Sequence, residues 1–310
     1  MRLATIEHDG KPKSAVIRAD GSAVLLDAAA GKAVGLAADD RTTSGDLLDL
    51  IAGGAASLAA AQQVADAAAA GGTQTIEAGA VRLLAPLPRP RKNVFCVGRN
   101  YAEHIAEGER AQNVKIGVTE VPVFFTKPPT AVIGPGAPIP IFADVSTSID
   151  YEVELALVIG KPGRDIPPEQ AYEHIFGYTI VNDVSARDVQ RRHGGQFFKG
   201  KALDGSCPMG PWIVTADEIA DPARLGIRLR VNGETRQDST TAAMIFDIPT
   251  LIASLSAGLT LESGDVIATG TPSGVGYAMD PPCFLRPGDV VSCEIDGIGR
   301  LENPVVDGRA

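Results

Sequence analysis

The chain has 310 residues, of which 45% are hydrophobic and 21% are charged, and its formal net charge is −10. This composition is typical of a globular protein with a sizeable core, in one large domain or two. The negative charge disfavours nonspecific binding to nucleic acid or to acidic membranes, so an anionic substrate would need local cations or a metal ion.

The first residues and the cysteines indicate a cytoplasmic protein. No apolar core of signal-peptide length follows Met1, and no run approaches the roughly 20 apolar residues of a membrane span. The four cysteines contain no Cys-x-x-Cys pair, which favours reduced thiols over a zinc site. We therefore expect a cytoplasmic protein that binds neither membranes nor nucleic acid.

Residues 1–85 predict a small α+β domain. Short strands are expected at 2–8, 14–19 and 24–26, followed by an alanine-rich surface helix over about 44–70. Residues 81–91 then predict a strand that runs into a proline-rich connector, where we place the domain boundary.

Residues 86–310 predict a second domain in which strands dominate. Asn232-Gly233 predicts a hairpin between 229–231 and 234–236. Neither a βαβ alternation nor a Gly-x-Gly-x-x-Gly motif is present, which disfavours a Rossmann fold. Helices are expected at about 102–110, 168–174 and 248–255, and β-prone runs at 93–97, 121–126, 151–159, 176–184, 212–214, 227–232, 265–269 and 290–295.

Two carboxylates on one apolar strand give the sharpest chemical signal. Residues two apart on a strand point to the same face, so Glu152 and Glu154 should project side by side. Two buried like charges raise each other's pKa, and a hard divalent cation relieves that conflict. Asp183, at the end of a later apolar strand, offers a third ligand. The alternative is that Asp183 caps the next segment while both glutamates face solvent.

Three further segments carry candidate functional groups. Lys199 and Lys201 lie beside aromatic and glycine residues and could approach an anion, although a solvated loop is the simpler interpretation. The Gly/Thr-rich stretch 269–276 could hold a carboxylate with backbone amides and hydroxyls, or be a plain turn. His104 and Glu107 are three apart on a predicted helix, so Glu107 could orient His104 as a base; most such pairs are surface contacts.

Together these motifs resemble the fumarylacetoacetate hydrolase family, in its acylpyruvase-like bacterial branch. Six motifs follow in the family's order from about residue 93 to 304, and together they are far more specific than any one alone. They are Gly-Arg-Asn-Tyr with His-x-x-Glu, Glu-x-Glu, Asn-Asp-Val-Ser-Ala-Arg-Asp, Gly-Lys followed by Cys-Pro-x-Gly-Pro, Asn-Gly-Glu-x-Arg-Gln, and Thr-Gly-Thr-Pro-x-Gly-Val-Gly.

The resemblance implies a mainly β fold with some α: a mixed β-sandwich or β-roll catalytic domain with a small α+β N-terminal domain, in a homodimer. It also implies Mg²⁺ or Mn²⁺ as cofactor. By motif position, the implied metal ligands are Glu152, Glu154 and Asp183, the catalytic residues are His104, Glu107 and Lys201, and the substrate-binding residues are Arg187, Gln190, Thr271 and Gly270. The His104–Glu107 pair would lie on a lid and activate water.

One departure from the family narrows the expected activity. Animal members carry an additional metal-binding Asp just before the His–Glu pair, where this chain has Arg99-Asn100. Our leading hypothesis is therefore hydrolysis of a carbon–carbon bond in a 2,4-dioxo acid, such as an acylpyruvate or fumarylpyruvate, to pyruvate and a carboxylic acid. The alternatives are decarboxylation of oxaloacetate, keto–enol isomerisation or hydration of related 2-oxo-diene acids, and, remotely, a non-catalytic metal-binding protein.

Overall fold

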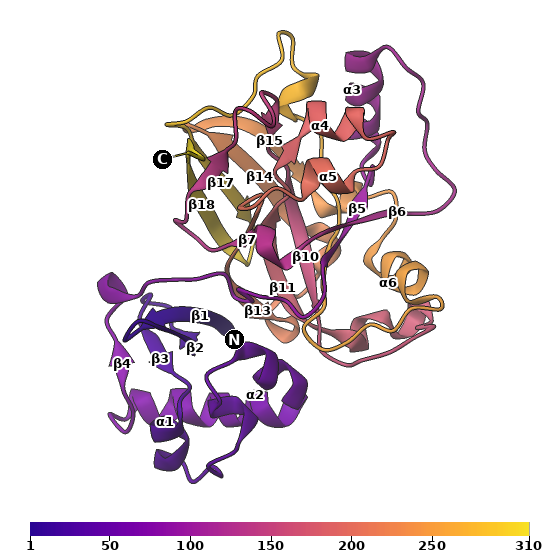
Figure 1. Ribbon diagram of the computed structural model, residues 1–310. Helices are drawn as coiled ribbons and strands as arrows, with labels where there is room; N and C mark the ends of the chain where they lie inside the picture. Colours follow the sequence, from indigo (N-terminus) through magenta and orange to yellow (C-terminus); the bar gives the residue numbers. More distant parts are fainter. Residues whose placement is uncertain (310) are drawn as a thin grey trace.

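The structure, a computed structural model, describes residues 1–309. Figure 1 shows the N-terminal part of the chain at one end of the molecule and the rest gathered at the other. The N-terminal elements are β1 (Arg2–His8), β2 (Lys11–Ile17), β3 (Ala23–Leu25), α1 (Ala28–Ala33), α2 (Leu47–Ala69) and β4 (Thr75–Ile76).

The remaining elements are mostly strands. The helices are α3 (Ala102–Gln112), α4 (Arg187–Arg192), α5 (Phe198–Lys201) and α6 (Ile248–Ser256). The strands are β5 (Val94–Gly98), β6 (Val123–Lys127), β7 (Val132–Ile133), β8 (Ile139–Ile141), β9 (Ile149–Asp150), β10 (Val153–Ile159), β11 (Ile175–Asn182), β12 (Ser185–Ala186), β13 (Cys207–Thr215), β14 (Gly226–Val231), β15 (Glu234–Thr240), β16 (Val266–Ala268), β17 (Val290–Ile295) and β18 (Gly299–Asp307).

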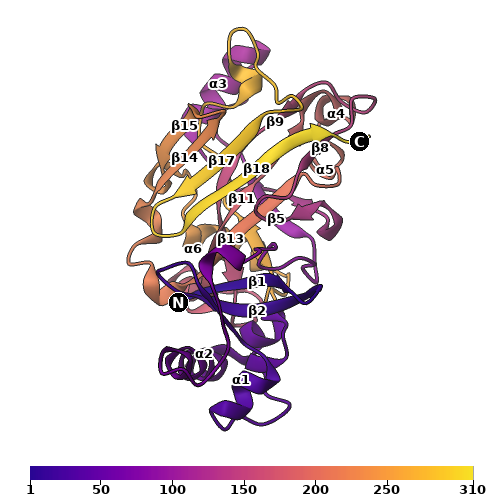
Figure 2. The same cartoon turned by 90° about the vertical axis from the view of Figure 1, so that its left-hand side faces the viewer.

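Two large sheets face each other around the main core. The first has the order β4-β3-β2-β1-β13-β11-β10-β16-β5-β6, with β7 added beside β13. The second has the order β15-β14-β17-β18-β8, and Figure 2 shows β17 and β18 lying across the front of β11. Apolar side chains of both sheets, among them Leu155, Leu157, Leu229 and Leu301, form one buried cluster. This packing confirms the expected mixed β-sandwich.

The N-terminal strands extend the first sheet rather than forming a separate one. β1 pairs antiparallel with β13 through Arg2↔Val214 and Leu3↔Ile213. A second buried cluster joins Leu3 and Val24 to Val158 and Ile213 from the C-terminal part. The boundary at residue 86 remains a prediction, and the strand pairing and the shared core both cross it.

Several predicted elements differ in the structure. Instead of a strand at 81–85 there is one isolated bridge, Ile6↔Leu83, and the prolines that follow lack the N–H groups that would continue the ladder. Residues 168–174 form a 3₁₀ helix rather than an α-helix. β13 is longer than predicted and contains Pro208 and Pro211, and β18 was missed. In β18 the exposed charged residues obscure an alternation that becomes clear only once β17 and β8 lie beside it.

The helix α2 lies within the predicted range 44–70 but is more deeply packed than the surface helix that was expected. Gly54, at φ +59°, interrupts the helical backbone, and Leu50, Ile51 and Val64 are completely buried in the second cluster. By length and composition the helix could cross a membrane, contrary to the expectation that no stretch approaches a span, yet 44% of its most apolar stretch is buried within the protein. A core helix has these same properties.

Candidate active site

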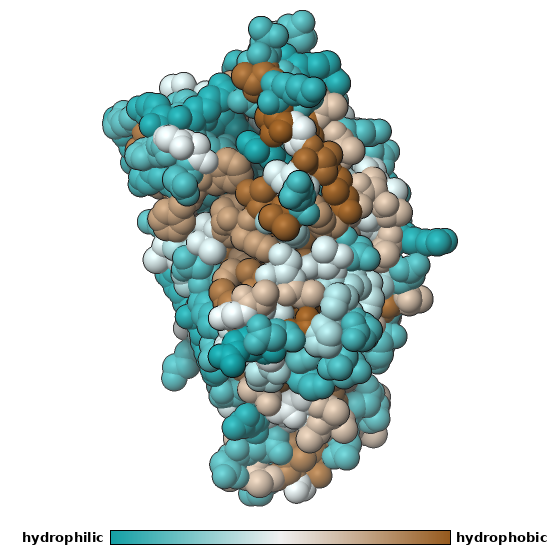
Figure 3. All heavy atoms as spheres, turned by 90° about the vertical axis from the view of Figure 1, so that its right-hand side faces the viewer, coloured by the Kyte–Doolittle hydropathy of each residue, from teal (hydrophilic) through white to brown (hydrophobic). Residues whose placement is uncertain are grey.

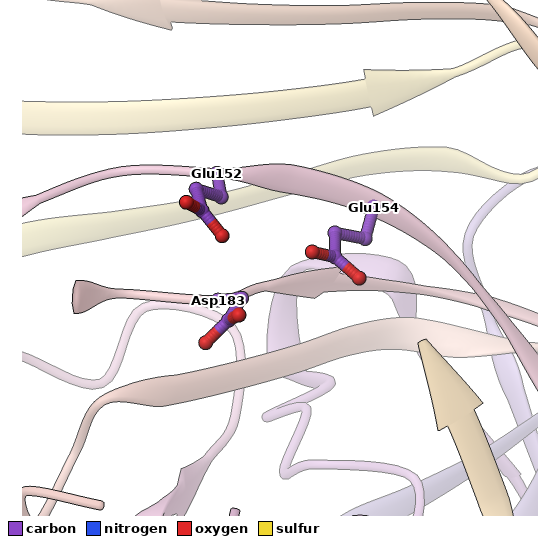
Figure 4. A group of neighbouring side chains, drawn as sticks. All are labelled: Glu152, Glu154 and Asp183. Atoms are coloured by element: carbon purple, nitrogen blue, oxygen red, sulfur yellow. The ribbon is translucent and has the colours of Figure 1, made fainter. Parts of the chain in front are cut away.

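Three buried carboxylates meet where β10 and β11 lie side by side. Glu152 comes immediately before β10, Glu154 lies within it, and Asp183 directly follows β11. Antiparallel pairing of Val153 with Asn182 and of Glu154 with Val181 brings them together, and Figure 4 shows the three side chains converging. Ligand atoms of all three lie within 4.8 Å of one another. Glu152 stands outside the ladder predicted to include it, but it still projects beside Glu154.

The surroundings shift the pKa values of the two glutamates in opposite directions. Burial opposes ionisation of Glu152, but Lys201 and Arg187 outweigh it and hold the pKa of this carboxyl below its usual range. Burial, reinforced by Asp183 and Glu152, raises the pKa of Glu154 well above its usual value. Glu154 accepts a hydrogen bond from the amide of Gly270 at 2.8 Å, and no cation contacts it within residues 1–309. Its charge is therefore the least compensated of the three.

This donor set fits a hard divalent cation. Such ions prefer carboxylate oxygens, and three convergent carboxylates leave further positions of an octahedral shell for other ligands. A cation held by Glu152, Glu154 and Asp183 would relieve the repulsion that raises the pKa of Glu154. The arrangement suits both Mg²⁺ and Mn²⁺.

Two lysines from different elements support the carboxylates. Lys201 Nζ lies 2.6 Å from both Glu152 Oε2 and Asp183 Oδ2. Although burial disfavours its charge, Asp183 and Glu152 raise the pKa of Lys201, so the side chain remains an ammonium. Lys127, at the end of β6, donates to Asp183 Oδ1 at 2.8 Å and to the carbonyl oxygen of Lys201 at 2.5 Å.

Arg187 connects the cluster to a fourth carboxylate. Its Nε lies 2.9 Å from Asp150 Oδ2, and its Nη2 lies 2.6 Å from Glu152 Oε1. Asp150 also accepts from the amides of Gly276 at 2.8 Å and Tyr277 at 3.1 Å. Arg187 is thus a buried bridge whose guanidinium is largely committed to protein carboxylates.

His104 and Glu107 form a hydrogen-bonded pair on α3. His104 Nδ1 lies 2.8 Å from Glu107 Oε1, and Glu107 Oε2 accepts from the amide of Gly274 at 2.8 Å. The Gly/Thr-rich loop therefore fixes the carboxylate, and the carboxylate orients the imidazole. This leaves Nε2 of His104 as the ring nitrogen available on the cavity side.

Hydrogen bonds to Val153 and Gln237 fix the Gly/Thr-rich loop in place. Thr271 donates its hydroxyl to the carbonyl oxygen of Val153 at 3.0 Å, and Gln237 donates to Thr271 Oγ1 at 2.8 Å. Gly270 has φ +98°, and a Cβ there would lie 2.8 Å from that of Asn100, so only glycine fits. Thr271 lines the cavity, whereas the amide of Gly270 is used on Glu154.

A cavity of about 180 Å³ unites most of these groups. Its lining includes His104, Glu152, Glu154, Arg187, Gln190, Lys201 and Thr271, together with Arg99, Phe125, Phe197 and Tyr277. The segment that follows α3 contributes Ile116 to the wall and exposes Val114, Val118 and Val121. Figure 3, which views the molecule from the right-hand side of Figure 1, shows hydrophobic side chains gathered on the upper half of that side. Glu107 and Asp183 stand behind the lining, and Lys199 is exposed away from it.

Four supporting residues were not identified from the sequence. Lys127, Asp150, Asn100 and Gln237 are all completely buried and hydrogen-bonded to the site or its loop. The lysine that closes an apolar strand, Lys127, is one local signal that could have drawn attention. Asn100 and Gln237 lie within two of the quoted motifs, which gave them no role of their own. Asp150, Asn100 and Gln237 make contacts to residues far away in the sequence.

Comparison with known proteins identifies a family and its relatives. The profile of the fumarylacetoacetate (FAA) hydrolase C-terminal family matches residues 93–306. Oxaloacetate tautomerase YisK of Bacillus subtilis is 48% identical over 269 residues, which cover 85% of this chain and 87% of that protein. The mitochondrial oxaloacetate tautomerase fahd2 of Xenopus laevis is 48% identical over 73% of this chain and 69% of its own length.

Solved structures show the same fold along the whole chain. A fumarylacetoacetate hydrolase from Exiguobacterium antarcticum is 43% identical, with a TM-score of 0.80 and 99% coverage of both chains. Maleylpyruvate hydrolase from Sphingobium sp. SYK-6, in complex with manganese(II) and pyruvate, is 31% identical, with a TM-score of 0.75, and covers 99% of this chain and 100% of its own.

Proposed function

Because this chain belongs to the fumarylacetoacetate hydrolase family, and is therefore an enzyme of that superfamily, we propose that it interconverts the keto and enol forms of a small 2-oxo acid of the oxaloacetate type, with Mg²⁺ or Mn²⁺ as cofactor. The observation that carries this proposal is the placement of His104. Its imidazole, oriented by Glu107, lines the same cavity as Glu152, Glu154 and Lys201. A proton-transfer group thus faces the groups that would bind a 2-oxo acid.

The keto-acid end of the substrate would bind at the inner end of the cavity, which is the part lined by Glu152, Glu154 and Lys201. Glu152, Glu154 and Asp183 would hold the divalent cation, which supplies a positive charge to offset the negative charge that develops on the 2-oxo oxygen. Lys201, hydrogen-bonded to Glu152 and Asp183, would add to the positive potential there. Gln190 and Thr271 line the cavity and would bind and orient the acid.

Proton transfer at C3 falls to His104. We assign this role to His104 rather than to Lys201, because the Nζ of Lys201 is held 2.6 Å from both Glu152 Oε2 and Asp183 Oδ2. The imidazole of His104 has its Nδ1 paired with Glu107, so its other nitrogen can remove a proton from C3 of the keto form and deliver the same proton to the 2-oxo oxygen, which gives the enol; the reverse sequence restores the keto form. Glu107 stabilises the imidazolium formed in between.

Hydrolysis of a carbon–carbon bond in a 2,4-dioxo acid is the second candidate. Its specific support is the fumarylacetoacetate hydrolase from Exiguobacterium antarcticum, which matches along 99% of both chains. In this reaction His104 would deprotonate water instead of a carbon acid. The tautomerase ranks first because the relatives at 48% identity carry that activity in their names.

The deciding experiment follows products rather than a single rate. The purified protein is incubated with Mg²⁺ or Mn²⁺ and with oxaloacetate, acetylpyruvate, fumarylpyruvate or maleylpyruvate in parallel. We expect the protein to speed the approach to the keto–enol equilibrium of oxaloacetate, which is measured by the absorbance of the enol. No stoichiometric release of pyruvate should accompany it. Release of pyruvate from a 2,4-dioxo acid at a higher rate than oxaloacetate is tautomerised would establish a hydrolase. Release of carbon dioxide from oxaloacetate would establish a decarboxylase.

The homodimer and the cytoplasmic location also belong to this proposal. The family resemblance suggests the dimer, and size-exclusion chromatography with light scattering would measure the mass in solution. A particle with the mass of one chain at micromolar concentration would contradict the dimer.

A further inference from the structure

Two of the four cationic side chains at the cavity are not paired with a carboxylate of the protein. The lining contains Arg99, Arg187, Arg191 and Lys201, together with the carboxylates of Glu152 and Glu154. Arg187 and Lys201 form ion pairs with Glu152 and with two carboxylates that do not line the cavity, Asp150 and Asp183. Within residues 1–309, Arg99 and Arg191 form no such pair, so their charges are available to a second negative group of a ligand.

Arg99 lies apart from the cations that contact the carboxylates. Lys201 and Arg187 contact the carboxylates at the inner end. An aromatic wall leads outward from there: Lys201 Nζ is 5.0 Å from the ring of Phe125, and Phe125 packs edge-on against Phe197 with 5.5 Å between centroids. The guanidinium of Arg99 lies 5.6 Å from the ring of Phe197. Two aromatic rings, those of Phe125 and Phe197, therefore connect Lys201 to Arg99 along the cavity wall.

The backbone holds Arg99 in an uncommon conformation. Arg99 has φ +60°, in the left-handed region that non-glycine residues seldom occupy. The next residue, Asn100, is completely buried and donates its side-chain amide to the carbonyl oxygens of Phe246 and Thr269 at 3.1 Å and 2.8 Å. Gly98, on the other side, lets Phe197 approach, since a Cβ there would lie 3.1 Å from the ring. Both neighbours thus fix where Arg99 enters the cavity wall.

The charge of Arg99 is not neutralised by the protein. Within residues 1–309, no carboxylate lies within 4.0 Å of its guanidinium, whereas Arg187 pairs with both Asp150 and Glu152. Arg99 is also half-buried, and its guanidinium lies over the ring of Phe197. This contact orients the planar guanidinium and leaves its N–H donors available to a ligand. Such a guanidinium is suited to a bidentate bond with a ligand carboxylate.

We propose that Arg99 binds the second carboxylate of a dicarboxylic 2-oxo acid whose keto-acid end occupies the inner end of the cavity. This rests on the proposed function in one respect, the orientation of the ligand. Arg191 is a weaker candidate for the same role, because it is exposed and lies 5.7 Å from the ring of Tyr277 on another part of the lining. The Arg99 subsite makes the enzyme selective for diacids over monoacids of equal length.

The test compares two ligands that differ in one group. Oxaloacetate and 2-oxobutanoate are four-carbon 2-oxo acids that end in a carboxylate and in a methyl group, respectively. Binding of each, freshly dissolved, to the Mn²⁺-loaded protein is measured by calorimetric titration for the unchanged chain and for Arg99→Met, Arg99→Lys and Arg191→Met. Arg192→Met is the matched control, since Arg192 is an exposed neighbour that does not line the cavity. Thermal unfolding verifies that each variant is folded.

We expect Arg99→Met to weaken binding of oxaloacetate about 10- to 100-fold, as loss of a charged, bidentate hydrogen bond does, and to leave 2-oxobutanoate unchanged. Arg99→Lys should retain part of the preference, and Arg192→Met all of it. Equal binding of both acids by the unchanged protein would overturn the proposal, as would a loss of preference in Arg191→Met alone. Selectivity that depends on Arg99 in a protein without turnover of oxaloacetate would refute the tautomerase and leave this subsite standing.

Discussion

The ammonium of Lys127 lies 2.8 Å from Asp183 Oδ1, and both side chains are completely buried. Burying an isolated charge costs a large amount of free energy, and the ion pair between Lys127 and Asp183 offsets that cost for both groups. Lys127 also donates to the carbonyl oxygen of Lys201, at 2.5 Å. It therefore fixes a proposed metal ligand and, through the backbone, the element that carries Lys201.

Replacing Lys127 by Met should strongly destabilise the protein. The substitution leaves Asp183 buried with only Lys201 as a cationic partner, and breaking a buried pair costs about 3–5 kcal/mol in the free energy of unfolding. Urea denaturation monitored by circular dichroism measures this loss. Lys199→Met is the matched control, because Lys199 is exposed and should change stability by less than about 0.5 kcal/mol. Equal effects of the two substitutions would contradict a structural role for Lys127.

Removing divalent cations should abolish activity and lower thermal stability. Dialysis against EDTA takes away the charge that the three carboxylates require, and addition of Mg²⁺ or Mn²⁺ should restore both properties. The midpoint of thermal unfolding should rise with the concentration of the cation, because only the folded protein presents the site. Full turnover after exhaustive chelation would rule out the metal site.

Glu154→Gln separates metal binding from simple charge repulsion. The amide removes one ligand and also a charge that its buried surroundings disfavour, since the pKa of Glu154 is raised. We expect the cation-free variant to be more stable than the unchanged protein, and its unfolding midpoint to respond little to Mn²⁺. Differential scanning calorimetry with and without Mn²⁺ tests both points. An undiminished response to Mn²⁺ would exclude Glu154 as a ligand.

His104→Ala should lower turnover by about 10²- to 10⁴-fold without affecting the metal site, as loss of a general base does. Glu107→Gln should give a smaller loss, because the imidazole stays in place but its imidazolium is less stabilised. The steady-state rate and the Mn²⁺-induced shift in unfolding temperature are measured on the same samples. His193→Ala serves as the control, since His193 is exposed and does not line the cavity. Turnover maintained in His104→Ala would require a different base.

The four cysteines should differ in their reactivity toward a thiol reagent. Burial raises the pKa of Cys207 to about 12, and it also raises the pKa of Cys96 and Cys293, so these thiols stay protonated at pH 8. Cys283 is only half-buried. Titration with a chromogenic disulfide should therefore detect one reactive thiol in the folded protein and four in urea. Fast reaction of Cys283→Ser would show that a buried thiol is accessible.

Local sequence patterns were sufficient for most of the fold. Runs of apolar, β-prone residues located the buried strands, and Asn232-Gly233 located the hairpin between β14 and β15. Patterns failed where long-range pairing decides the conformation. β18 contains Arg300, Glu302 and Pro304 and forms a strand because β17 and β8 supply its hydrogen-bonding partners.

The sequence by itself determined that Glu152 and Glu154 share one side of a strand, because strand geometry repeats every two residues. It also determined the family, through the order of the motifs. Only the tertiary structure decided which cations accompany these carboxylates. Lys127, Arg187 and Lys201 reach them from β6, α4 and α5, across contacts that no spacing along the chain encodes. The register between β10 and β11 brings the carboxylates together, and the packing of β6, α4 and α5 around them decides the difference in charge compensation between the two glutamates.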